Sequence, residues 1–518
     1  MRLTLPDPDP NLARSVETNP LHLREWLIGL PTGNVMEAGR MLLDALSTLN
    51  RVKLEAEERV KLLDEYQNSL EMLTGAFESA YASPGLPMKE SARLAAQLAL
   101  NLWVEMTLGW KQALMDKVDK KFSFFTSTKM VPILLQAVVY SFWRTYQVCT
   151  RLFQPLPSGM WGEIHQVFRY AAENKFLDER KSDNPKEKAS RSIATVYKQM
   201  LLLALADPQR FSGPELDKIL EIIEGYASYA HFQPVSKLNS SAGFFLIELE
   251  FDRPPQFVGN RSLDHLPGQS LLFDTIELAK KLHKAESNVE SKVPLANDRQ
   301  KVQMWLEILR RVIRQWSISP QRLYQRIPAQ ASVEVVLGLP QAVLQLNGGM
   351  PLMMPEQSIA AALDALTSAQ SIPWQVINES PGGYAILARD LPSEQARPGE
   401  VVAIRAASDA GWMVASIRWL QQRYDGATEM GLQVMSAKAQ PVLLRPIGLN
   451  AELDFLPALL LPSIAALKQS QRAVTAKGLY TPLREFTVLN SNGEESKIRC
   501  AKLIEQQMGY DLFEYTSD

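Results

Sequence analysis

The 518-residue sequence is poor in the residues that build disulfides and metal sites. It contains two cysteines and five histidines. Cys149 and Cys500 lie far apart, so two buried reduced thiols are a better interpretation than a disulfide, although the sequence leaves both open. The histidines are scattered, and none lies at metal-ligand spacing from a cysteine or a carboxylate. We therefore expect no metal site.

Long hydrophobic runs and an excess of one charge are also missing. The longest apolar runs, at 131–140 and 455–467, are too short or too interrupted by proline for a membrane-spanning helix of about 20 residues. Residues 1–11 contain no apolar segment typical of a signal peptide. The net charge is −2, so no overall field attracts the chain to nucleic acid or anionic lipid. We expect a cytoplasmic protein that binds no nucleic acid and does not insert into a membrane.

The common catalytic motifs are absent as well. The sequence contains no GxGxxG, GxxxxGK[ST], GxSxG or HExxH. This excludes the usual templates for dinucleotide binding, phosphate-loop hydrolysis, serine esterases and zinc peptidases. We therefore expect that the chain is not an enzyme and has no catalytic residues.

The composition that remains is that of a folded protein with several domains. Hydrophobic residues make up 46% of the chain and charged residues 22%, which is ordinary for globular protein. The length exceeds what a single core supports and favours about three domains.

Apolar residues recur at helical spacing through the first three fifths of the chain. The predicted helices are 36–49, 54–81, 91–121, 131–152, 192–206, 213–231, 275–284 and 296–316. We expect a helical bundle at 1–190, then a mainly helical domain at 191–316 with one short strand at 243–251. Its last helix carries Arg310, Arg311 and Arg314 on its polar side. These arginines form either a solvated face or the contacts of a lever between the two halves of the chain.

After Pro320 the pattern changes to short β-like runs separated by turn residues. The predicted strands are 332–337, 342–346, 374–378, 384–388, 401–406, 412–420, 429–435 and 441–445. One helix is expected at 356–369. Short strands at this spacing favour a sandwich or a barrel, which we place at 317–447. A β-rich extension at 448–518 follows, with Asn492–Gly493 as a hairpin turn.

Two arginines precede the first of these strands, in the sequence Pro320–Pro328 (PQRLYQRIP). Arg322 and Arg326 are spaced as RxxxR, and the flanking prolines favour a loop. A guanidinium can bind a phosphate with two hydrogen bonds, stack on a base, or donate to the O6 and N7 atoms of guanine. Taken alone, the pair is as well explained by two solvated side chains.

A turn with polar and glycine residues follows the run 374–378. It reads Asn378-Glu-Ser380-Pro-Gly-Gly383. Asn378 offers an amide donor and acceptor to a base edge, Ser380 adds a hydroxyl, and Gly383 lets a ligand approach the backbone. Taken alone, these residues are also those of an ordinary tight turn.

Together, an RxxxR loop before a strand and an [D/N]xSxxG turn between strands resemble the PilZ domain. The later segments Ser416–Leu420 and Met430–Met435 resemble its last strands, where a tryptophan strand pairs with one that begins in glycine. The resemblance covers roughly 317–447 and implies binding of cyclic di-GMP through Arg322, Arg326, Asn378, Ser380 and Gly383, with Gln321 as a further residue of the site. Gln321 stands where many members carry another arginine, and Asn378 follows Arg326 by 52 residues (378 − 326), a longer interval than usual.

The resulting prediction is an α+β multidomain protein: an all-α N-terminal bundle, a PilZ-like antiparallel β-barrel and a small β-rich tail. The implied function is that of a bacterial cyclic di-GMP effector whose helical region binds a protein partner, with an output in motility, pili or biofilm formation. The sequence lacks the GGDEF and EAL signatures of enzymes that make or degrade this messenger. The alternatives are a ligand-independent PilZ scaffold in a membrane-associated assembly and an enzyme hidden in the helical half.

Overall fold

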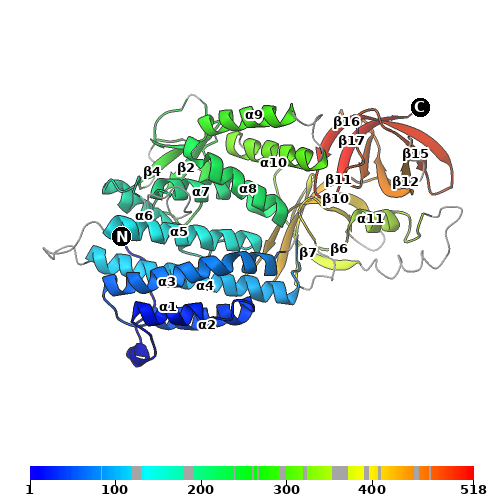
Figure 1. The fold of residues 1–518 in the computed structure, drawn as a ribbon. Coiled ribbons are helices and arrows are strands. Elements are labelled where there is room, and N and C mark those ends of the chain that lie inside the picture. The colour runs from blue at the N-terminus through cyan, green and yellow to red at the C-terminus, as the bar shows by residue number, and fades with distance from the viewer. Residues whose placement is uncertain are drawn as a thin grey trace. The chain divides into compact units, whose positions relative to one another are not determined.

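The computed structural model divides the chain into two compact units (Figure 1). Unit 1 comprises 1–83, 88–208 and 215–320, and unit 2 comprises 84–87, 209–214 and 321–518. The residues that the structure describes are 1–82, 85–119, 130–179, 191–238, 240–259, 262–264, 266, 268–291, 299–318, 324–352, 371–389, 396–406, 410–448, 454–465 and 468–517.

Unit 1 is mainly helical, as predicted. Its α-helices are α1 (Pro20–Ile28), α2 (Val35–Leu49), α3 (Ala56–Ala80), α4 (Glu90–Asp119), α5 (Met130–Arg151), α6 (Met160–Glu173), α7 (Ile193–Leu205), α8 (Gly213–Tyr226), α9 (Ile276–Glu290) and α10 (Arg299–Ser317). Its short 3₁₀ helices are η1 (Pro10–Arg14) and η4 (Ala227–Tyr229), whereas η3 (Pro208–Arg210) lies mostly in a segment of unit 2. The long helices α3, α4 and α5 pack in sequence order, and α5 is buried from Val131 to Thr150 except at Ile133. Its uniformly apolar sequence follows from this central place in the bundle.

Unit 1 also contains a four-stranded sheet, where the sequence predicted a single strand. The strands are β1 (His231–Pro234), β2 (Phe244–Glu248), β3 (Gln256–Phe257) and β4 (Ser270–Asp274), in the order β1-β4-β2-β3. The helix predicted to end at His231 stops earlier, because His231 and Phe232 pair with Asp274 and Phe273 of β4. Strands of two to five residues show too little alternation to be read from sequence.

The first sheet of unit 2 contains the predicted PilZ-like strands. They are β5 (Ile327–Pro328), β6 (Ser332–Leu337), β7 (Ile372–Ser380), β8 (Gly383–Ala388), β9 (Val401–Arg405), β10 (Met413–Gln422) and β11 (Thr428–Ser436). Their order is β5-β7-β6-β9-β10-β11-β8, and β8 also pairs with β7, so the sheet closes on itself. The predicted pairing of the tryptophan strand with the glycine strand is confirmed, since Trp419 lies opposite Gly431.

The prediction of a strand at 342–346 was wrong, because this segment lies in helix α11 (Leu339–Leu346). Pro340 lies in its first turn, where its fixed φ suits a helix and no N–H is missed. Leu339, Ala342 and Val343 are buried at the i, i+3, i+4 spacing of a helix. The helix predicted at 356–369 lies outside the described residues.

The C-terminal extension is a closed six-stranded barrel of its own. Its strands are β12 (Gln440–Pro446), β13 (Leu456–Leu461), β14 (Arg472–Thr475), β15 (Glu485–Leu489), β16 (Glu495–Gln506) and β17 (Asp511–Ser517), in the order β12-β13-β14-β17-β16-β15. Strand β12, which the sequence analysis placed with the preceding strands, thus pairs within this barrel. The Asn492–Gly493 turn joins β15 to β16 as predicted, with Gly493 at φ +79°.

The two barrels of unit 2 share one hydrophobic core. Val336, Ala403 and Val414 from the first sheet pack with Leu459 and Leu512 from the C-terminal barrel. A half-buried ion pair joins them as well: the Arg418 guanidinium on β10 donates two hydrogen bonds to the Glu505 carboxylate on β16, the longer at 3.0 Å. The C-terminal barrel is therefore a structural part of the unit that carries the PilZ-like sheet.

Three further findings bear on the predictions made from composition. Cys149 and Cys500 are both buried and free, as the sequence analysis favoured, and burial raises the pKa of the Cys500 thiol to about 11. Among the described residues, no helix has the length and hydropathy needed to cross a membrane. The same residues contain no cluster of three or more metal-ligating side chains.

Candidate ligand-binding site

The predicted glycine turn is a tight β-hairpin between β7 and β8. Ser380 pairs with Gly383, so only Pro381 and Gly382 form the connection. The Ser380 hydroxyl donates to the Gly383 carbonyl oxygen at 3.3 Å. Asn378 sits two residues before Ser380 on β7, half-buried. The hairpin therefore carries both polar side chains of the motif close to the turn.

Gly383 is required here by a close backbone approach. It pairs with Gln433 of β11, and a methyl group on its Cα would lie 3.0 Å from the Leu432 carbonyl carbon and closer still to its oxygen. A backbone atom within a sheet cannot move aside easily, so no other residue fits. On the same edge, the Val434 N–H donates to the Gly382 carbonyl oxygen at 3.0 Å. Strand β11 thus fixes the turn from one side.

The arginine segment lies along the other side of the hairpin. Ile327 pairs with Glu379 and Pro328 with Asn378, in antiparallel register. One more step of the same register would bring Arg326 opposite Ser380, the last residue of β7. The Tyr324 ring lies beside the turn itself, because its Cδ2 and Cε2 atoms are 3.0 and 3.3 Å from the position that a Cβ on Gly382 would take. Two motifs that are far apart in sequence thus meet at one hairpin.

This register also places the polar side chains on a common face. In an antiparallel pair, residues directly opposite each other, and those two positions along, share one side of the sheet. Arg326 then shares a face with Ser380. Arg326 is exposed, and within the described part of the chain no carboxylate pairs with it. Its guanidinium is available for an anion, beside a hydroxyl and an amide that suit the edge of a base.

Two of the predicted site residues, Gln321 and Arg322, lie outside the described residues. Arg326, Asn378, Ser380 and Gly383 are described, and all four belong to the β5, β7 and β8 neighbourhood. The sequence analysis missed Tyr324. An aromatic residue inside RxxxR, together with two consecutive glycines in the turn, was the signal that could have identified it.

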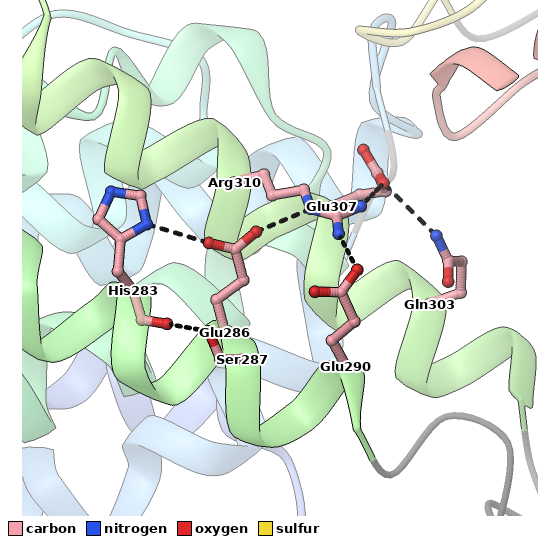
Figure 2. A network of polar contacts seen from close by, with 7 residues as sticks. All are labelled: His283, Glu286, Ser287, Glu290, Gln303, Glu307 and Arg310. Carbon is pink, nitrogen blue, oxygen red and sulfur yellow. Dashed lines mark hydrogen bonds and ion pairs between the residues drawn. The ribbon is translucent and has the colours of Figure 1, made fainter.

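Two arginines of the expected lever helix, Arg310 and Arg311, take part in ion pairs within unit 1, and Arg311 pairs with Glu215 at 2.6 Å. Figure 2 shows Arg310 of α10 donating to Glu286 and Glu290 of α9, both at 2.9 Å, and to Glu307 of its own helix at 3.1 Å. His283 is within 3.2 Å of Glu286 in the same network. The Arg310 guanidinium lowers the pKa of the Glu286 carboxyl, against the rise that burial alone would cause. Arg310 therefore holds α9 to α10 and is more than a solvated side chain.

Comparison with known proteins gives a consistent match along the chain. Three domain models of one family match in order: "Cyclic-di-GMP receptor FimW, N-terminal domain" at residues 21–237, "Cyclic-di-GMP receptor FimW, middle PilZ domain" at 244–353 and 354–441, and "FimW C-terminal beta-barrel domain" at 442–517. The match to the middle domain begins well before 317, where the sequence alone placed the barrel.

A curated relative has the same description. The cyclic-di-GMP receptor FimW of Pseudomonas aeruginosa is 22% identical, over 100% of this chain and 93% of the relative. The order of the three domains agrees with the helices, the PilZ-like sheet and the closed C-terminal barrel described above. The chain therefore belongs to this multidomain family, in which a PilZ domain lies between a helical N-terminal domain and a C-terminal β-barrel domain.

Proposed function

We propose that this protein is a cytoplasmic receptor for cyclic di-GMP that transmits binding of the messenger to a protein partner. The ligand site consists of Arg322, Arg326, Asn378, Ser380 and Gly383, with Gln321 at its edge. The observation that carries the proposal is the pairing of the Tyr324–Pro328 segment with the end of β7, next to the Asn378–Gly383 turn. Membership in a family described as cyclic di-GMP receptors supports the same ligand.

The chemistry of the site suits the chemistry of this ligand. Cyclic di-GMP carries two phosphates and two guanines. Arg326 can bind a phosphate oxygen or the O6 and N7 atoms of a guanine through paired N–H donors. Asn378 and Ser380 can satisfy donor and acceptor groups of a second base edge. Gly383 has no side chain, so the ligand can approach its backbone next to these groups. No metal is needed, because the arginines themselves balance the phosphate charge.

Transmission to a partner is assigned to the helical region of unit 1. That region belongs to a family domain of its own, and neither its sequence nor its described side chains present a catalytic motif or metal cluster. Protein binding is the default role of such a domain. The outputs implied by the PilZ resemblance are motility, pili or biofilm formation.

Calorimetric titration of the full chain with cyclic di-GMP tests the ligand. We expect saturable heat with cyclic di-GMP and none with cyclic di-AMP, which keeps the phosphate ring but lacks the guanine O6 acceptor. Arg326→Ala removes one charge-assisted interaction, worth about 1.5–3 kcal/mol, and should weaken binding by about 10- to 150-fold. Arg389→Ala is the matched control, since Arg389 is an exposed arginine just beyond the far end of β8 that pairs with Asp425.

The outcomes separate the alternatives. If folded protein gives no heat with cyclic di-GMP, the receptor function is wrong and a ligand-independent scaffold replaces it. If binding is normal in Arg326→Ala, the messenger binds elsewhere. For the output, the full chain is immobilised with and without cyclic di-GMP and the captured proteins are compared. If the same proteins are captured with and without cyclic di-GMP, the proposed transmission is wrong.

A further inference from the structure

One contact at the site belongs to neither sequence motif: the ring of Tyr324 against the backbone of Gly382. Tyr324 lies between the two arginines of RxxxR, at a position that the motif does not specify, and Gly382 is the first glycine of the turn. We propose that Tyr324 is a positioning residue for ligand binding, whose ring holds the arginine segment against the hairpin. This inference rests on the function proposed above and adds a residue to that site.

The geometry shows why Gly382 is a glycine. Its backbone does not adopt the left-handed conformation that favours glycine, in contrast to Gly399 at φ +79°. What distinguishes position 382 is the tyrosine ring, which lies so close that an added Cβ would be only 3.0 Å from Cδ2. Gly382 therefore provides a flat surface on which the ring packs.

Within the described residues, the segment from Tyr324 to Pro328 has few other attachments. Every residue from Tyr324 to Pro328 is exposed, and β5 contributes just two residue pairs, Ile327 with Glu379 and Pro328 with Asn378. Tyr324 lies two residues before Arg326 and four before Pro328, so its ring fixes the segment on the far side of the arginine. Arg326 is then held between the Tyr324 contact on one side and the residue pairs of β5 on the other.

Holding the segment in place before the ligand arrives increases the apparent affinity. When only a fraction of molecules has the binding-competent arrangement, the apparent Kd rises by the inverse of that fraction. If loss of the ring leaves the segment in place about one tenth of the time, binding weakens about tenfold. The tyrosine hydroxyl has no part in this effect, because the contact is made by ring carbons.

The test compares four variants of the full chain by calorimetry with cyclic di-GMP. Tyr324→Ala removes the ring and should weaken binding about tenfold. Tyr324→Phe keeps the ring and should bind within about twofold of the wild type. Gly382→Ala pushes the ring away and should weaken binding about threefold, with no further loss when combined with Tyr324→Ala. Tyr424→Ala is the matched control, since Tyr424 is an exposed tyrosine in the β10–β11 connection, at the other end of β11 from the turn.

A second readout does not depend on the ligand. Amide hydrogen exchange of the peptide covering 321–330 should become faster in Tyr324→Ala and stay unchanged in Tyr324→Phe, in protein without ligand. A purely structural role would instead lower the melting temperature of the whole unit. We expect no such change, because Tyr324 is 44% exposed.

The results distinguish this inference from the proposed function. If the wild type binds no cyclic di-GMP, the function fails, and the exchange rates alone decide whether Tyr324 holds the segment. If the wild type binds and Tyr324→Ala binds equally well, the positioning role is overturned. Equal weakening in Tyr324→Phe and Tyr324→Ala also overturns it, because the hydroxyl would then carry the effect.

Discussion

The packing of Trp419 on Gly431 gives a quantitative prediction for the stability of the pairing between β10 and β11. The two residues lie opposite each other on β10 and β11, and the indole covers the glycine so closely that an added Cβ would be 2.6 Å from Cδ1 and closer to two other ring atoms. In Gly431→Ala the half-buried indole must therefore leave its place. Overpacking of this kind costs about 1–3 kcal/mol.

Replacing Trp419 as well shows whether the indole causes the destabilisation. Once Trp419→Ala has removed the indole, the three atoms that lie nearest to the new methyl group are gone. Alanine is then favoured over glycine within a strand by roughly 0.5–1 kcal/mol. The same glycine substitution should thus destabilise the sheet in one background and stabilise it in the other. The coupling free energy between the two positions is the difference, about 1.5–4 kcal/mol.

Amide hydrogen exchange of peptides covering 413–436 measures this locally, which is preferable because a chain of several domains does not unfold in one step. Gly411→Ala is the control glycine, since an added Cβ there meets nothing within 4 Å. An equal loss of protection by Gly431→Ala with and without Trp419, or no loss in either, would refute the argument.

Three further predictions concern other contacts of the structure. Gly383→Ala forces a methyl group against the Leu432 carbonyl, so both exchange protection of the β7–β8 hairpin and cyclic di-GMP binding should be lost, while Gly448→Ala, with nothing within 4 Å, should leave both intact. Arg418→Met leaves the Glu505 carboxylate without its cation and should destabilise the pairing of the two barrels by about 2–3 kcal/mol, which amide hydrogen exchange of peptides covering β10 and β16 can measure; adding Glu505→Leu should restore most of the loss. His165 is fully buried between the Tyr197 hydroxyl and the Arg253 carbonyl, and burial lowers its pKa. The unfolded chain protonates His165 near pH 6.5, whereas the folded chain protonates it only at lower pH. The free energy of unfolding is therefore at its full value above about pH 6.5 and falls below it by up to about 1.4 kcal/mol per pH unit. Thermal melts of the helical signal across pH 5–7.5 should show this slope, and His165→Gln should reduce it.

Much of the fold could be predicted because long elements repeat their pattern many times. The helix predicted at 131–152 is α5, and the strands predicted at 401–406 and 429–435 are β9 and β11. The errors lie where an element is short. The segment 342–346 contains too few residues to distinguish alternation from a helical face. Pro340, in the first turn of α11, favours the helix that forms. Strands β1, β3 and β4 exist because a partner strand is available, which a local pattern does not report.

The candidate site divides in the same way. The sequence by itself determined which residue types stand at RxxxR and at the glycine turn, because a resemblance of motifs depends on identity and order. It also determined the grouping of helices before strands, since periodicity is a local property of the chain. Only the tertiary structure decided that Ile327 and Pro328 pair with the end of β7 and that the Tyr324 ring lies against Gly382, because the register between β5 and β7 joins residues about 50 positions apart. The tertiary structure likewise explains why positions 383 and 431 are glycines, because the atoms that exclude a side chain there belong to other strands.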